Sequence, residues 1–197
     1  MRDCHLSDGP TVQPPHGVLR LFHFSENPGI RLFEPRPVRT PSARRPGQEW
    51  LNGPLVWAIA QDHQRLYLFP RECPRIVVWP CQASSPADRD QWLGSMQPGT
   101  RAVAFIETAW AERVGTGHTY RYELPACSFE SLEDVGMFVS RQAVHPVARE
   151  MVVDLPGALC DSQTELRVVD SLAPLKTVWQ STLHASGIRL RNAAGWA

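Results

Sequence analysis

The sequence predicts an α+β fold, with a mixed, mainly antiparallel sheet and a few flanking helices. Three observations favour this class. Short apolar or β-branched runs recur along the chain and end at proline or glycine. Short turns join most neighbouring runs, which is typical of antiparallel pairing. No internal repeat and no shift in composition marks a second folding unit, so we expect a single domain over residues 17–197.

The expected strands share an apolar centre and turn residues at their ends. They are residues 19–25, 54–59, 75–80, 101–107, 118–124, 137–140, 150–154 and 165–169. In the fifth of these, tyrosine and leucine alternate with polar side chains, as in a half-exposed antiparallel strand. The segment Gly115-Thr116-Gly117 before it is typical of a hairpin turn.

Helix signals are fewer than strand signals. Asp62 can cap a short helix that leads into residues 64–69. Ser85-Pro86 is typical of an N-cap followed by proline at the first helical position, which predicts a helix over residues 84–97.

Three further helical segments are expected in the second half of the chain. One or two turns carry Trp110 and Arg113, and another turn is expected over residues 129–136. Apolar residues recur at helical spacing over residues 172–183, which predicts a last helix that Gly187 ends.

The charge balance disfavours two classes of partner. The 20 basic residues match 20 acidic ones, so no net field draws the chain to nucleic acid or to a membrane surface. No apolar run approaches the ~18 residues that can cross a bilayer. We therefore expect no membrane association, and nucleic acid is a disfavoured partner.

Cysteine usage and the first residues favour a cytoplasmic protein. The five cysteines are odd in number and form no Cys-x-x-Cys pair, which argues against a disulfide framework and a structural zinc site. They are expected to be small core residues. The first segment lacks a signal-peptide pattern, and the polar residues 1–16 are expected to form a flexible leader.

The first candidate site is the end of the opening strand, His23-Phe24-Ser25. Side chains two residues apart on a strand point to the same face, so the imidazole of His23 and the hydroxyl of Ser25 lie together. They could hold a ribose or an amide by directional hydrogen bonds. The alternative is a partly buried histidine that bonds to a backbone carbonyl.

The second candidate is an aromatic cluster with arginines. Trp57, Tyr67 and Phe69 could stack on a planar ligand while Arg71 holds an anionic group, and Arg75 follows close by. The alternative is core packing of the rings, with Arg71 paired to the neighbouring glutamate.

Other polar residues carry weaker signals. Glu107 ends an apolar strand, where a carboxylate is either solvated, catalytic or paired with Arg113 or Arg71. Gln142 and His145 follow another short strand and could supply an amide and an acid or base, or simply form a turn. No metal site is expected, because the residues that could form one lack diagnostic spacing. These residues are His23, Glu26, His118 and His145.

A turn-rich basic loop gives the alternative to an enzyme. Four arginines lie in or just before residues 38–49: Arg36, Arg39, Arg44 and Arg45. Such a loop would suit a non-catalytic binding or interaction module with an acidic partner. A third reading is a structural protein whose seven tryptophans are mostly core, without an open pocket at His23.

Several of these motifs resemble a bacterial domain family of unknown function, over roughly residues 18–150. The matching segments are Leu21-Phe22-His23-Phe24-Ser25-Glu26, Pro54-Leu55-Val56-Trp57-Ala58, Tyr67-Leu68-Phe69-Pro70-Arg71-Glu72-Cys73-Pro74-Arg75 and Tyr120-Arg121-Tyr122. The resemblance implies no established activity.

The order of the motifs also resembles the ADP-ribosyltransferase-like fold. That fold opens with a strand carrying His-x-Thr or His-x-Ser, which His23-Phe24-Ser25 matches, and continues with aromatics similar to Trp57 and Tyr67. Its third motif places a glutamate on a later strand. Residues 138–142 are similar in position but contain no glutamate, and Gln142 is the nearest candidate. A glutamine has no negative charge with which to stabilise an oxocarbenium ion.

This resemblance implies an enzyme, or a degenerate relative, that binds NAD or another nucleotide-like small molecule. The catalytic residues would be His23 and Gln142. The substrate-binding residues would be Ser25, Trp57, Tyr67 and Arg71, all lining one accessible cleft.

Overall fold

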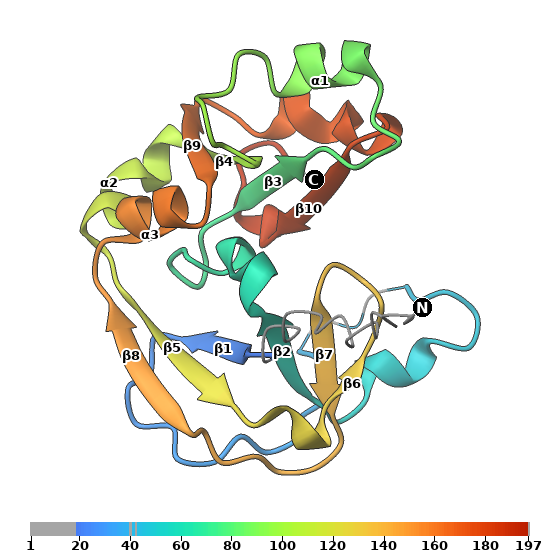
Figure 1. The fold of residues 1–197 in the computed structure, drawn as a ribbon, viewed down its shortest axis with the longest axis vertical. Coiled ribbons are helices and arrows are strands. Elements are labelled where there is room, and N and C mark those ends of the chain that lie inside the picture. The colour runs from blue at the N-terminus through green and yellow to red at the C-terminus, as the bar shows by residue number, and fades with distance from the viewer. Residues whose placement is uncertain (1–18, 40, 42, 197) are drawn as a thin grey trace, which may run out of the picture.

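The computed structural model describes residues 19–39, 41 and 43–196, and its strands form two sheets (Figure 1). The predicted leader over residues 1–16 lies outside the described residues. The larger sheet has six strands, and every pairing in it is antiparallel. Its order is β6 (Glu130–Ser131), β7 (Met137–Ser140), β2 (Val56–Ala60), β1 (Leu21–Ser25), β5 (Thr119–Leu124) and β8 (Ala148–Val152).

The smaller sheet has four strands, in the order β10 (His184–Ile188), β3 (Arg75–Trp79), β4 (Ala102–Glu107) and β9 (Thr164–Val169). Only β4 and β9 pair in parallel. Parallel neighbours need a long crossover. Here the chain between them leaves the small sheet, adds β5 to β8 to the large one, and returns. The predicted α+β class with mainly antiparallel pairing is confirmed, with the strands divided between two sheets.

Three α-helices and five 3-10 helices occur in the described part of the chain. The α-helices are α1 (Pro86–Trp92), α2 (Thr108–Thr116) and α3 (Leu155–Asp161). The 3-10 helices are η1 (Glu49–Asn52), η2 (Gln61–Leu66), η3 (Ala126–Ser128), η4 (Ala173–Gln180) and η5 (Leu190–Asn192). The predicted cap of α1 is confirmed, because the Ser85 hydroxyl accepts a hydrogen bond from the Asp88 backbone N–H. No helix among these is long and apolar enough to cross a membrane.

The prediction of a last α-helix ending at Gly187 was wrong. Residues 173–180 form the 3-10 helix η4, and Gly187 lies inside strand β10, opposite Ile76. A Cβ at Gly187 would lie 2.8 Å from the ring of Trp179, so this glycine allows η4 to pack on the strand. The strand forms because β3 offers it a free edge, and local sequence does not report such an edge.

Two shorter predictions were also wrong. Residues 115–117 do not form a hairpin turn: α2 runs through Thr116, and Gly117 ends it where a Cβ would clash with the Arg113 carbonyl oxygen. Residues 129–136 form β6 and a turn, not a helix. Glu133 and Val135 there have φ of 53° and 47°, in the left-handed region that a right-handed helix excludes.

The main core lies between the two sheets. Alternate residues of β1 and β2, such as Phe22 and Ile59, pack in one buried cluster with Val77 and Ile106 of the small sheet. Leucines of α3 complete this cluster, and α2 lies beside α3 in Figure 1. Strands β3 and β4 are buried along their whole length, because η4 covers their other face.

The cysteines only partly follow the core prediction. Cys73 is fully buried, whereas Cys81 is half-buried and Cys127 and Cys160 are exposed. All four are free thiols. Cys127 lies in η3 and Cys160 near the end of α3, each on an exposed side of its helix, which the residue type alone does not indicate.

Glu107 proves to be a structural carboxylate. It is 3% exposed, and its carboxylate accepts hydrogen bonds from the backbone N–H groups of Leu172, at 3.1 Å, and Ala194, at 3.0 Å. The suggested ion pairs with Arg113 and Arg71 do not form. Glu107 instead connects the end of β4 to the backbone just before η4, at Leu172, and to the backbone after β10, at Ala194.

We predict that Glu107→Gln destabilises the protein by about 1–3 kcal/mol, because a neutral amide oxygen accepts the two backbone N–H groups more weakly than a carboxylate does, and the amide NH₂ in place of Oε2 would face the Ala194 N–H. Urea unfolding would measure the loss. Glu112→Gln, at an exposed position of α2, is the matched control and should change the free energy of unfolding little. Equal stability of wild type and Glu107→Gln would contradict this role.

Candidate functional site

The candidate site lies where the ladder between β1 and β2 opens. These strands pair only at Leu21↔Ala60 and Phe22↔Ile59, whereas β1 stays paired with β5 as far as Ser25. Backbone groups of β2 beyond that point need another partner. Three cavities meet at this opening, and His23 lines all of them.

His23 replaces the missing ladder bond. Its Nδ1 lies 2.8 Å from the Trp57 carbonyl oxygen, and its ring packs 4.7 Å from that of Phe33. A carbonyl can only accept, so Nδ1 carries the proton and the lone pair of the neutral ring is on Nε2. No described residue gives Nε2 a hydrogen bond. The backbone-bonded alternative therefore holds for one ring nitrogen and leaves the other available.

Burial lowers the pKa of His23; the hydrogen bond to the Trp57 carbonyl offsets part of this change, and the nearby charge of Arg71 adds a smaller lowering. The imidazole is therefore neutral at pH 7. A neutral ring with a fixed Nδ1 proton is suited to accept a proton, or a hydrogen bond, at Nε2.

Ser25 lies two residues further along β1 and lines two of the same cavities. It is almost fully buried, and its hydroxyl oxygen accepts the Asn27 backbone N–H at 3.1 Å. This bond begins the turn after the strand. The hydroxyl proton is not used by that bond and can be donated to a ligand.

The largest of these three cavities has a volume of about 780 Å³. His23, Ser25, Trp57 and Arg71 all line it, so four predicted site residues come together there. Its lining is strongly basic, with two glutamates, Glu34 and Glu72, against six arginines. The arginines are Arg31, Arg36, Arg39, Arg71, Arg189 and Arg191.

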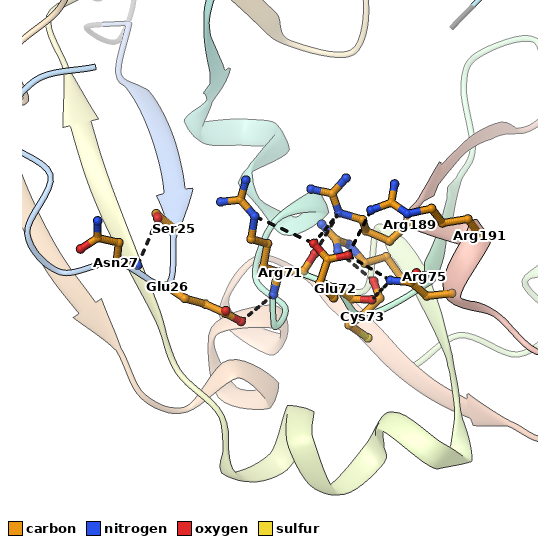
Figure 2. A network of polar contacts seen from close by, with 10 residues as sticks. Ser25, Glu26, Asn27, Arg71, Glu72, Cys73, Arg75, Arg189 and Arg191 are labelled. Atoms are coloured by element: carbon orange, nitrogen blue, oxygen red, sulfur yellow. Dashed lines mark hydrogen bonds and ion pairs between the residues drawn. The ribbon is translucent and has the colours of Figure 1, made fainter. Parts of the chain in front are cut away.

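Glu72 organises three of these arginines (Figure 2). Its carboxylate oxygens lie 3.1 Å from Arg191, 3.5 Å from Arg189 and 4.0 Å from Arg71. A hydrogen bond from Asn192, followed by the three guanidinium charges, holds the pKa of Glu72 below its ordinary value. One carboxylate cannot neutralise three guanidinium groups, so positive charge remains.

A smaller inner cavity of about 140 Å³ shares His23, Ser25, Arg71 and Arg189 with the large one. Arg75 also lines it. Arg189 reaches this place because β10 pairs with β3 so that Ile188 lies opposite Arg75.

Tyr67 lies deeper than predicted. It lines the inner cavity and a third one of about 60 Å³, but not the large cavity. Its ring stacks on Phe24 with centroids 6.1 Å apart, and its hydroxyl contacts the Met137 sulfur at 3.7 Å. Burial raises the pKa of Tyr67, which therefore stays protonated. Its packing matches the core alternative, although it also borders a cavity.

Gln142 is apart from this group. It is exposed, it follows the end of β7, and it lines none of the three cavities. Its backbone N–H donates to the Ser140 hydroxyl at 3.2 Å, as in the turn that was the alternative. The sheet order β7-β2-β1 separates it from His23 by a whole strand, which motif order along the chain cannot reveal.

The remaining candidates have structural contacts. His145 bonds to the Arg31 carbonyl oxygen at 2.8 Å, and Arg113 lies over the Trp110 ring at 4.5 Å. The basic loop contributes Arg36 and Arg39 to the large cavity, whereas Arg44 bonds to Asn52. Among residues 19–39, 41 and 43–196, no group of three or more histidine, cysteine, aspartate or glutamate residues is placed to hold a metal ion.

Sequence reasoning missed Arg189 and Arg191. Both follow β10, and that segment was expected to end a helix. A run of arginines near the end of a chain is no signal by itself, since all but one of the 20 basic residues are arginines.

The lowered pKa of His23 predicts a pH effect on stability. Its folded pKa lies below the value of about 6.5 in unfolded chains, so the unfolded state takes up the proton first. The free energy of unfolding should therefore be full above about pH 6.5 and fall as the solution is acidified towards the folded pKa.

The variant His23→Asn keeps an N–H donor for the Trp57 carbonyl but cannot titrate. Urea unfolding between about pH 8 and about pH 5 should show a flatter dependence for the variant than for wild type. Burial also lowers the pKa of His63, so His63 adds a similar pH dependence to the free energy of unfolding. Wild type and variant both contain His63, so the difference between their curves reports His23 alone. Parallel curves would show that His23 makes no such contribution.

Comparison with known proteins identifies a family for this chain but no activity. A family model described as "Family of unknown function (DUF6886)" matches residues 22–193, well beyond the part in which the resemblance was seen. No curated protein and no solved structure matches the chain. The resemblance to the ADP-ribosyltransferase-like fold thus gains no support, whereas the predicted relation to an uncharacterised family is confirmed. The chain belongs to the family of unknown function DUF6886.

Proposed function

We propose that this protein binds a small, phosphate-bearing, nucleotide-like ligand in the large cavity beside His23. One observation carries the proposal. The chain has no net charge, yet six arginines and only two glutamates line a cavity of about 780 Å³. That volume lies within the range of about 300–1,000 Å³ typical of small-molecule sites. A basic cavity in a neutral protein favours a local anionic ligand over a large acidic surface.

The chemistry of the lining supports the same ligand class. Guanidinium groups match phosphate oxygens in a bidentate manner. Phe33, Val56 and Trp57 add apolar surface to the same cavity, against which a base or sugar can pack. His23 Nε2 and the Ser25 hydroxyl supply directional polar groups of the kind that orient a ligand.

His23 is the candidate proton acceptor of a reaction at this site. Its ring is neutral, its Nδ1 proton is held by Trp57, and Nε2 has no hydrogen-bond partner among the described residues. A catalytic role for Gln142 lacks such support, because its side chain lies outside the cavities.

NAD and ADP-ribose are natural first ligands to test, since both carry a pyrophosphate. Four free cysteines in the described part of the chain support a reducing compartment such as the cytoplasm.

Calorimetric titration with AMP, ADP-ribose and NAD tests the proposal. We expect binding heat with at least one of them. Arg36→Gln should weaken the binding of ADP-ribose or NAD, whose pyrophosphate would lie in the large cavity, by roughly tenfold to a hundredfold, the usual cost of losing a hydrogen bond to a charged group. Arg36 is exposed, and the one ion pair that its side chain makes within the described part of the chain is with Glu34, at 3.3 Å, so this variant should fold normally.

Arg141→Gln is the matched control. Arg141 is another exposed arginine in a surface ion pair, with Glu130 at 3.8 Å, but it does not line the cavity. An equal loss in both variants, or no heat with any nucleotide, would refute the proposal. Binding of an acidic peptide instead would favour the non-catalytic interaction module.

A further inference from the structure

The inner cavity contains a guanidinium group without a counter-ion. Arg75 is 2% exposed and lies at the start of β3. It makes no ion pair with any carboxylate in the described part of the chain. A charge removed from water is costly unless it is paired, so a buried arginine of this kind needs a physical explanation.

The protein provides hydrogen-bond acceptors for only some of the N–H donors of Arg75. Its Nε and Nη2 donate to the Leu66 carbonyl oxygen at 3.0 and 2.8 Å, and its Nη1 donates to the Cys73 carbonyl oxygen at 3.0 Å. A guanidinium has five N–H groups, so some donors remain available. The Phe69 ring lies 5.1 Å away and offers its face, but carbonyl dipoles and a ring cannot cancel a full charge.

Two further arginines line the same cavity. Arg71 and Arg189 reach it from separate segments, and Glu72 holds both of their side chains (Figure 2). The lining contains one carboxylate, that of Glu26, which accepts the Arg71 backbone N–H at 2.9 Å. Three guanidinium groups therefore line a cavity of about 140 Å³, and counting Glu72 as well as Glu26 they outnumber the carboxylates near them.

Burial lowers the pKa of Arg75 to about 10. The group is still charged at neutral pH, so the excess positive charge is real under ordinary conditions.

We infer that the inner cavity is a subsite for a terminal phosphate group, held by Arg75, Arg71 and Arg189. This inference rests on the proposed function, because the cavity shares four lining residues with the large one that would receive the rest of the ligand. Room is sufficient: the volume corresponds to on the order of ten water molecules. A dianionic phosphate supplies the missing counter-charge and enough oxygens for guanidinium donors from three directions.

The subsite also selects among ligands. The inner cavity is less than a fifth of the volume of the outer one, so it suits an end group and not a second nucleotide. The phosphate of NAD is an internal pyrophosphate, whereas a phosphomonoester such as AMP ends in a dianion. The geometry therefore favours phosphomonoesters over dinucleotides. It also places the phosphate in a cavity that His23 lines.

The test compares AMP, adenosine, NAD and inorganic phosphate by calorimetric titration of the full chain. Wild type should bind inorganic phosphate, and should bind AMP at least tenfold more tightly than adenosine or NAD. In Arg71→Gln and Arg75→Lys this preference for AMP over adenosine should shrink by about tenfold, with adenosine affinity unchanged. Thermal unfolding checks that both variants fold. If Arg75→Lys does not fold, Arg71→Gln decides, since the one polar contact that the Arg71 side chain makes with the described residues is a 4.0 Å ion pair to Glu72, whose loss the fold should tolerate.

Arg141→Gln is again the matched control. Arg141 is an exposed arginine in an ion pair with Glu130 and lines neither cavity. This variant should keep the preference for AMP over adenosine.

The outcomes separate the two proposals. Equal affinity of wild type for AMP and adenosine would overturn the subsite while leaving the large cavity as a nucleotide site. A full AMP preference in Arg71→Gln, or its loss in Arg141→Gln, would overturn it as well. Binding of phosphate without any nucleotide would support the subsite and refute the nucleotide-like ligand. No binding of any of the four compounds would refute both.

Discussion

The early end of the ladder between β1 and β2 is the constraint on which the cleft depends. After Phe22 the two strands stop exchanging backbone bonds, and the Trp57 carbonyl oxygen still needs a donor. The imidazole of His23 supplies it at 2.8 Å. One side chain thus fills a gap in the sheet, fixes its own tautomer and lines the cavities that the gap creates. A continuous ladder here would close the site.

Charge placement is the second level of organisation. Although the chain has no net charge, six arginines line the large cavity and three line the smaller one beside it. Glu72 keeps several of them close together in spite of their repulsion, and its own pKa is lowered by the Asn192 hydrogen bond and then by these guanidinium charges. Arg75 represents the extreme case, since its charge is buried against two carbonyl groups and aromatic rings. Such an arrangement costs stability in the empty protein, and an anion would offset that cost.

Local pattern predicted much of the fold and part of the site. The apolar runs of β1 to β5 were visible because strands buried on one or both faces are rich in Val, Ile and aromatic residues. Ser85 was recognised as a cap, since its bond to Asp88 involves residues three apart. His23 and Ser25 were paired by the two-residue repeat of a strand. Each of these predictions depends on interactions within a few residues.

The sequence by itself determined the fold class, most of the strands, and the presence of a histidine and a serine on one face of β1. It also determined the chain's neutrality, but not where the charges gather. Only the tertiary structure decided that β10 adds to the edge of β3, which brings Arg189 to Arg75, and that β2 separates Gln142 from His23. The physical reason is that strand pairing across more than a hundred residues depends on free edges and packed faces, and the local pattern of residues does not encode these.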